Sequence, residues 1–266
     1  MANSAPLGVF DSGVGGLSIL KELRFLLPGE DLMYLADSSH CPYGTKTTEA
    51  IRQRTLEVTD FLLAQGAKAI VVACNSACVA GLDQIREAHP GLPVIGVEPA
   101  IKPAHDLTRN GKIGVLATNM TISGPRFNLL VEKYGGGVEV YTQPGPGLVE
   151  LVEAGKAESA DTEALLQKYL APLLEKGIDT LVLGCTHYPF LRPLIAKLGG
   201  PELVIIDTGL AVARQTQRIV NEQGLAKPDG LPGWERFYTT GAPEQVAAVI
   251  ADLWGQAQVA VVEARF

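Results

Sequence analysis

The sequence predicts an α/β protein of two pseudo-symmetric domains, each with a mainly parallel sheet flanked by helices. Short apolar, β-branched runs alternate with helical stretches along the whole chain, as is typical of repeated βαβ units. Two features also recur: the strand containing Gly8 resembles the strand containing Gly114, and the setting of Cys74 resembles that of Cys185. The two offsets, 106 and 111 residues, are similar enough to indicate an internal duplication, although a general likeness among α/β chains is the alternative.

The first half of the chain predicts a βαβαβ series. Apolar runs place strands at 7–10, 32–36, 69–73 and 94–97, because buried parallel strands are apolar on both faces. Helices are predicted at 16–27, at 47–65, where the pattern is long and amphipathic, and at 77–88.

The second half repeats this plan, with strands predicted at 112–117, 138–141, 180–183 and 203–206 and helices between them. Two final helices, at 210–221 and 243–254, are expected to pack on the first domain. We therefore expect domain one to span 1–98 plus 209–266 and domain two 99–208, with the active site in the cleft between them.

Composition excludes several function classes. The 266 residues are 47% hydrophobic and carry a net charge of −7 without any Lys/Arg run, so nothing in the charge pattern favours nucleic acid or an anionic membrane. No basic and apolar leader and no apolar stretch of about 20 residues is present, which predicts a cytoplasmic protein. Four cysteines are too few for a disulfide framework and have no zinc-ligand spacing, so we expect reduced thiols and no metal.

Two of these thiols are the strongest functional signal. Cys74 and Cys185 each follow an apolar strand and precede small hydroxyl, amide or imidazole side chains. Chemistry in open α/β sheets gathers at the carboxyl ends of strands, so two such thiols can act as paired acid/bases on one ligand. A buried cysteine can also be a simple packing residue, which is how we interpret Cys41 and Cys78. To act as a base, a thiol needs a pKa below its ordinary value of about 8.5, which a helix N-terminus or an imidazole can provide.

A glycine-rich turn at 11–16 follows the first predicted strand. Its backbone N–H groups could bind an anion such as a substrate carboxylate. A dinucleotide fingerprint is the alternative, with Asp37 as the ribose ligand. That pattern lacks its third glycine, since Ser18 stands there, and Asp11 would repel a pyrophosphate.

Other polar residues have two interpretations each. His187 could assist Cys185 or be a structural histidine, and Asp11 could assist Cys74 or cap a helix. Glu153 is either a further helper or a solvated surface carboxylate. The Pro-Tyr-Gly segment at 42–44 is either a ligand-binding loop or a plain turn.

Four motifs occur in order along the chain: Asp-Ser-Gly-Val-Gly-Gly-Leu-Ser at 11–18, Pro-Tyr-Gly at 42–44, Ala-Cys-Asn-Ser at 73–76 and Gly-Cys-Thr-His-Tyr-Pro at 184–189. Together they resemble the signature set of the bacterial glutamate racemases, in the aspartate/glutamate racemase superfamily. The resemblance extends over almost the whole chain. Ser76 stands where the family usually has threonine, but it keeps the hydroxyl group.

This resemblance implies an enzyme without a cofactor that inverts glutamate at Cα, supplies D-glutamate for peptidoglycan and forms a homodimer. Cys74 would act on the D-enantiomer and Cys185 on the L-enantiomer, with Asp11 and His187 assisting and Glu153 as a further helper. The residues implied to hold L-glutamate and D-glutamate are Asp11, Ser12, Pro42, Tyr43, Gly44, Asn75, Ser76, Thr118, Thr121, Thr186 and His187.

Two alternatives stay open. A racemase for aspartate or another amino acid would share the same pair of thiols. A non-catalytic binding or regulatory protein could use the same scaffold, although the presence of both thiols argues against it. No lysine lies in a motif suited to a pyridoxal Schiff base, which agrees with the absence of a cofactor.

Overall fold

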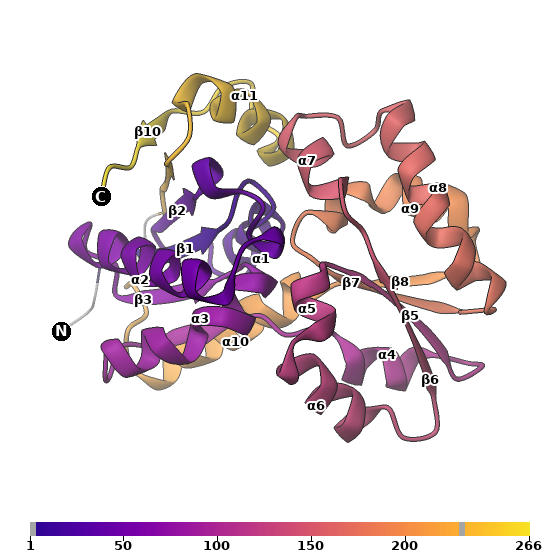
Figure 1. Ribbon diagram of the computed structural model, residues 1–266. Helices are drawn as coiled ribbons and strands as arrows, with labels where there is room; N and C mark the ends of the chain where they lie inside the picture. Colours follow the sequence, from indigo (N-terminus) through magenta and orange to yellow (C-terminus); the bar gives the residue numbers. More distant parts are fainter. Residues whose placement is uncertain (1–3, 229–231) are drawn as a thin grey trace. The chain divides into compact units, whose positions relative to one another are not determined.

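A computed structural model describes residues 4–228 and 232–266 of the chain. The chain forms two compact units, which we call unit 1 (Met1–Val97 with Gly209–Phe266) and unit 2 (Glu98–Thr208) (Figure 1). Each unit has its own parallel sheet with helices packed around it. The α/β fold class predicted from the sequence is therefore confirmed.

Unit 1 is built on a six-stranded sheet in the order β10-β9-β2-β1-β3-β4, in which every neighbouring pair is parallel. Its three central strands are buried along their whole length, as expected when helices cover both faces. The strands are β1 (Leu7–Asp11), β2 (Leu32–Ala36), β3 (Ala69–Val72), β4 (Val94–Gly96), β9 (Glu235–Thr239) and β10 (Val261–Glu263).

Two groups of helices cover this sheet: α2 packs against α3, and α1 packs against α10 and α11. The helix α2 begins where the Thr47 hydroxyl accepts the N–H of Ala50 (3.2 Å), an N-cap. The helices are α1 (Leu17–Leu26), α2 (Thr48–Ala64), α3 (Asn75–Ala88), α10 (Gly209–Glu222) and α11 (Pro243–Trp254), with short 3-10 turns η1 (Ser38–His40) and η2 (Tyr43–Thr45).

Unit 2 has a four-stranded parallel sheet in the order β6-β5-β7-β8. Its core includes a cluster in which Ile113, Val115 and Val182 pack with Phe127. The strands are β5 (Lys112–Ala117), β6 (Glu139–Pro144), β7 (Thr180–Gly184) and β8 (Val204–Ile206). The helices are α4 (Ile101–Leu107), α5 (Asn119–Ser123), α6 (Pro125–Tyr134), α7 (Leu148–Glu153), α8 (Ala160–Glu175) and α9 (Arg192–Gly199), with the 3-10 turn η3 (Tyr188–Leu191).

The two units share one strand order. The segment β2-β1-β3-β4 of unit 1 corresponds strand by strand to β6-β5-β7-β8 of unit 2. The register also corresponds, because Gly8 pairs with Ile70 and Gly114 pairs with Leu181, which reproduces both offsets seen in the sequence. Cys74 and Cys185 therefore follow equivalent strands, and this common topology supports an internal duplication.

Both glycines meet the same packing constraint. A Cβ atom on Gly8 would lie 2.9 Å from Cδ1 of Ile70, and one on Gly114 would lie 2.5 Å from Cδ1 of Ile178. Real Cβ contacts are not this short, so a larger residue at either position would require the neighbouring isoleucine side chain to move.

Several predicted elements coincide with the observed ones, including β2, β5 and α11. The prediction missed β9 and β10, which form one edge of the unit 1 sheet. Their sequences mix charged and apolar residues, because β10 is the edge strand and the first two residues of its neighbour β9 are not buried. The helix α3 begins at Asn75, two residues earlier than predicted, so Cys74 stands at its N-cap.

All four cysteines lie in the described part of the chain, and none of them forms a disulfide. Among the described residues, no helix combines the length and apolar character that crossing a bilayer requires.

Candidate active site

Cys74 lies between the end of β3 and the start of α3. It is buried, with 5% of its surface exposed, and it is the N-cap residue of a 14-residue helix. The positive end of the helix dipole favours a negatively charged group at this position, so the fold supports a thiolate there. Asn75 and Ser76, the next two residues, are also buried, and the side-chain Nδ2 of Asn75 has no hydrogen-bond partner among the described residues. An unpartnered buried amide is available to a ligand.

Asp11 is the last residue of the neighbouring strand β1, and the strand register places it next to Ala73, the residue before Cys74. The N–H of Ala73 donates to the carbonyl of Phe10 (2.9 Å), which joins the two strands one residue before Cys74 and Asp11. Ser12 follows Asp11 and is also buried, with its Oγ 3.9 Å from Sγ of Cys41.

The glycine-rich turn is organised differently from our expectation. Asp11 Oδ2 accepts the N–H of Gly16 at 3.0 Å and that of Gly13 at 3.4 Å, so two N–H groups that we expected to bind a substrate carboxylate bind this side chain instead. A Cβ on Gly16 would lie 2.7 Å from Cβ of Asp11 and 2.9 Å from the hydroxyl of Tyr34, which explains the glycine. Asp11 therefore stabilises the turn into α1.

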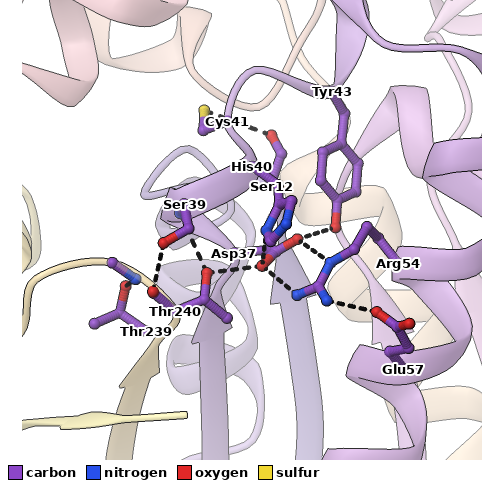
Figure 2. Close-up of polar contacts among 11 residues, drawn as sticks. Ser12, Asp37, Ser39, His40, Cys41, Tyr43, Arg54, Glu57, Thr239 and Thr240 are labelled. Carbon is purple, nitrogen blue, oxygen red and sulfur yellow. Dashed lines mark hydrogen bonds and ion pairs between the residues drawn. The ribbon is translucent and has the colours of Figure 1, made fainter. Parts of the chain in front are cut away.

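The Pro-Tyr-Gly segment at 42–44 is anchored by Asp37, a residue that our sequence analysis considered only as a ribose ligand (Figure 2). Pro42 precedes η2, and the buried Tyr43 donates its hydroxyl to Asp37 Oδ2 at 2.6 Å. The signal that could have identified Asp37 is its place directly after a central strand, beside the strand that ends in Asp11. The segment is thus more than a plain turn, since a buried carboxylate holds it.

Cys185 in unit 2 is part of a chain of side chains. Its Sγ lies 3.8 Å from Nδ1 of His187, and Nε2 of His187 lies 2.5 Å from Oε1 of Glu153, the last residue of α7. His187 is almost fully buried, at 1% exposed. A carboxylate that accepts Nε2–H leaves Nδ1 facing the thiol, where it can take up the thiol's proton.

Tyr188 holds the connection after Cys185. Its N–H donates to the carbonyl of Cys185 (3.1 Å), and its hydroxyl donates to the carbonyl of Gly145 (3.0 Å). Burial first, and then electrostatic repulsion between the phenolate and Cys185, raise the pKa of Tyr188 well above its ordinary value, so the phenol stays protonated.

Threonines lie at the same strand ends in unit 2. Thr118 directly follows β5, and β5 pairs with β7. Ala117 lies opposite Gly184 in this pairing, so the next residues, Thr118 and Cys185, are also neighbours. The hydroxyl of Thr118 accepts the N–H of Thr121 (3.2 Å) and caps α5. Thr186 is buried, with its hydroxyl 3.5 Å from Nδ1 of His187.

The structure therefore groups the predicted site residues within each unit. In unit 1, Asp11, Ser12, Cys74 and the segment containing Tyr43 follow neighbouring strands, and η2 contacts α3. In unit 2, Cys185 lies with Glu153, Thr118, Thr121, Thr186 and His187. In unit 2 the buried thiol lies 3.8 Å from an imidazole, and in unit 1 the buried thiol follows β3, the strand that pairs with β1 and its last residue, Asp11.

Cys78 has the packing role that we expected. Its Sγ accepts the N–H of Val97 (3.2 Å) and lies 3.3 Å from the carbonyl of Val72, inside the core of unit 1. Cys74, by contrast, stands beyond the end of β3, at the N-cap of α3.

Comparison with known proteins shows the family. The profile of the Asp/Glu/Hydantoin racemase family matches residues 17–216. The chain belongs to this racemase family. It is 51% identical over 254 residues to a glutamate racemase of Pseudomonas paraeruginosa, covering 96% of each chain, and 51% identical to one of Pseudomonas aeruginosa, covering 95% of each. The protein is therefore an amino-acid racemase, an isomerase.

Solved structures of racemases have the same fold. Glutamate racemase RacE1 of Bacillus anthracis matches with a TM-score of 0.88 and 35% identity over 98% of each chain. The Escherichia coli glutamate racemase, solved with L-glutamate and the activator UDP-MurNAc-Ala, matches with a TM-score of 0.85 and 31% identity over 97% of each chain. A Picrophilus torridus aspartate racemase, at 16% identity and a TM-score of 0.54, shares the fold alone.

Proposed function

We propose that this racemase interconverts L-glutamate and D-glutamate by proton transfer between Cα and two cysteines, without a cofactor. The observation that carries the proposal is the equivalent placement of Cys74 and Cys185, each buried within two residues of the end of the third strand of a repeated βα unit. The named function of the Pseudomonas relatives, at about half identity over nearly the whole chain, supports glutamate as the substrate.

The reaction divides into two proton transfers. With D-glutamate, the Cys74 thiolate takes the Cα proton and becomes a thiol, while the electron pair of the C–H bond is left on Cα and its carboxylate. The Cys185 thiol then gives its proton to the opposite face of Cα and becomes a thiolate, which yields L-glutamate. The reverse reaction begins with Cys185 as the base. This mechanism requires the two thiols to reach opposite faces of one Cα atom.

The assisting groups differ between the two thiols. His187, oriented by Glu153 at 2.5 Å, is placed to exchange a proton with Cys185. Cys74 has the N-terminus of α3 and the carboxylate of Asp11 at the neighbouring strand end instead. We propose that the helix dipole favours the Cys74 thiolate and that Asp11 assists its proton transfer.

A carbanion-like state at Cα also requires hydrogen-bond donors at the substrate carboxylates. Preorganised donors in a water-excluded site stabilise such charge more effectively than water does. The unpartnered Nδ2 of Asn75 is one such donor. The other proposed substrate-binding residues are Asp11, Ser12, Pro42, Tyr43, Gly44, Ser76, Thr118, Thr121, Thr186 and His187.

The biological setting that we propose is the supply of D-glutamate for peptidoglycan by a cytoplasmic homodimer. The family implies the role and the dimer, and four cysteines without a disulfide are compatible with a reducing compartment.

Proton NMR in D2O tests the proposal directly. Purified protein is mixed with D-glutamate without an added cofactor, and loss of the Cα proton signal is followed together with optical rotation. We expect Cα exchange accompanied by inversion. If aspartate is exchanged and inverted with a higher kcat/KM than that for glutamate, the substrate is reassigned. If neither amino acid is exchanged or inverted, a binding protein is favoured.

A further inference from the structure

Asp37 is a fully buried carboxylate that lies directly after β2, and both of its oxygens are occupied (Figure 2). Oδ2 accepts the hydroxyl of Tyr43 at 2.6 Å and Nε–H of Arg54 at 3.1 Å. Oδ1 accepts Nη2–H of Arg54 at 2.7 Å and the hydroxyl of Thr240 at 2.7 Å, with Nδ1 of His40 at 3.1 Å. The two Arg54 bonds form a bidentate pair, the strongest geometry between these groups.

This carboxylate is a fixed negative charge. Burial by itself would raise the pKa of Asp37, but hydrogen bonds from Arg54, Tyr43 and Thr240 outweigh that effect and leave the pKa below its ordinary value. The same pair raises the pKa of Arg54 despite its partial burial. Asp37 therefore works as an acceptor and is not suited to donating a proton.

The group that Asp37 holds most directly is Tyr43. The phenol ring is 1% exposed, and η2, which begins at Tyr43, contacts α3, the helix whose N-cap is Cys74. Burial, then the charge and hydrogen bond of Asp37, and then the negative charge of Cys74 all raise the pKa of Tyr43 far above its ordinary value. The phenol thus stays protonated, keeps donating to Asp37 and lies within electrostatic reach of the thiol.

Distant segments fix Asp37 in turn. Thr240 follows β9 and accepts two hydrogen bonds from Ser39. The N–H of Ser39 donates to the hydroxyl of Thr240 at 3.2 Å, and the hydroxyl of Ser39 donates to the carbonyl of Thr240. Arg54 projects from α2, where Glu57 accepts Nη1–H and the ring of Phe266 lies 4.9 Å from its guanidinium carbon. The loop at 38–45 is therefore held at its start by Thr240 and at Tyr43 by Asp37.

We propose that Asp37 is a positioning residue for proton transfer by Cys74, because it fixes the Pro-Tyr-Gly segment at 42–44 against the start of α3 through the Tyr43 hydroxyl. This inference rests on the proposed function, in which that segment binds substrate and Cys74 acts on the D-enantiomer. Thr240 and Arg54 act through Asp37 and touch neither thiol nor substrate in this scheme.

Two variants and two matched controls test the inference. Asp37→Asn removes the charge, and Thr240→Val removes one donor to it at constant shape. Asp179→Asn is the carboxylate control: Asp179 accepts the hydroxyl of Thr108 and backbone N–H groups, but it stands before β7, at the end of the strand away from Cys185. Thr216→Val is the threonine control, since that buried hydroxyl donates only to a carbonyl within α10.

The measurement is the isotope effect on kcat/KM with glutamate deuterated at Cα, taken separately from each enantiomer. If Cys74 transfers protons more slowly, cleavage of the Cα–D bond of D-glutamate limits the rate more, and its isotope effect rises. With L-glutamate Cys185 cleaves the bond, so that isotope effect falls. A smaller fraction of folded enzyme would lower kcat and leave both isotope effects unchanged.

We expect kcat/KM to fall about tenfold or more in Asp37→Asn and about three- to tenfold in Thr240→Val, with the asymmetric isotope effects in both. The controls should keep the wild-type isotope effects. Unchanged or symmetric isotope effects in Thr240→Val, which preserves the shape of the core, would overturn the inference even if Asp37→Asn fails to fold. If the wild-type protein does not racemise glutamate, the proposed function is overturned. That result differs from the one that would overturn the role of Asp37 alone, in which the wild type is active.

Discussion

Replacing Glu153 by glutamine should weaken proton transfer by Cys185 while leaving the fold of unit 2 intact. The carboxylate accepts Nε2–H of His187 at 2.5 Å, and the imidazole is 1% exposed, so water cannot substitute for the lost charge. Glutamine keeps the shape of the side chain but offers a neutral carbonyl or an amide donor. The imidazole then loses the partner that orients it toward Cys185.

The magnitude follows from the bond that is lost. A hydrogen bond to a charged group contributes about 1.5–3 kcal/mol, and about 1.4 kcal/mol corresponds to a tenfold change in rate. We therefore expect kcat/KM to fall roughly 10- to 150-fold. The two enantiomers have equal free energies in solution, so kcat/KM must fall by the same factor in both directions.

The assay is again the isotope effect from each deuterated enantiomer, and it should change in the direction opposite to that of Asp37→Asn. The isotope effect should rise with L-glutamate and fall with D-glutamate, because Cys185 has become the slower base. Glu150→Gln is the control, since Glu150 is exposed on the same short helix. A Glu153→Gln enzyme as active as this control, or one with unshifted isotope effects, would refute the role of the Cys185–His187–Glu153 chain.

Three further outcomes are expected. Cys74→Ser and Cys185→Ser should keep the wild-type circular dichroism and lose more than about 100-fold in racemisation, since a hydroxyl is a far weaker acid/base than a thiol; near wild-type turnover in either would contradict the two-base mechanism. Lys68→Met should lower the free energy of unfolding by about 3–5 kcal/mol in urea titrations, because the buried Glu30 loses the opposite charge at 2.5 Å and keeps the N–H of Lys227. Adding Glu30→Gln should restore part of that loss, and no recovery would mean that the pair is not the cause. Hydrogen bonds lower the pKa of Asp179 in the folded protein, so its contribution to stability is present above the unfolded value of about 3.9 and is lost as pH falls through the folded pKa. The stability difference between wild type and Asp179→Asn should therefore shrink as pH falls below about 4, and a difference that grows there would reverse the assigned sign.

The sequence alone was sufficient for the parts of the fold that depend on local pattern. The apolar runs that became β1, β2, β3, β5 and β7 are buried on both faces, so they carry a continuous signal that no tertiary contact needs to supplement. The repeat could also be predicted, because the glycine-containing strands and the two cysteine settings recur at similar offsets, and Gly8 and Gly114 occupy crowded positions in both units. The edge strand β10 and its neighbour β9 mix charged and apolar residues, so they lack that signal and were missed.

Only part of the candidate site could be predicted from the sequence. Cys74 and Cys185 stand directly after strands, and chain topology alone brings strand ends to one edge of a sheet. Their roles stay predictions. The use of the Gly13 and Gly16 N–H groups by Asp11 agrees with the capping alternative, but the sequence does not show whether such a turn binds its own side chain or a ligand.

Local spacing in the sequence thus determined the α/β class, the repeated strand plan and the two thiols at strand ends. Tertiary structure alone decided which side chains pair across long separations. Glu153, at the end of α7, contacts His187, which is 34 residues away in the sequence. Thr240 contacts Asp37 across a sequence separation of 203 residues. Periodicity reports which face of a strand or helix is buried, whereas a hydrogen bond needs two atoms within about 3 Å, and only the packed chain brings such distant atoms together.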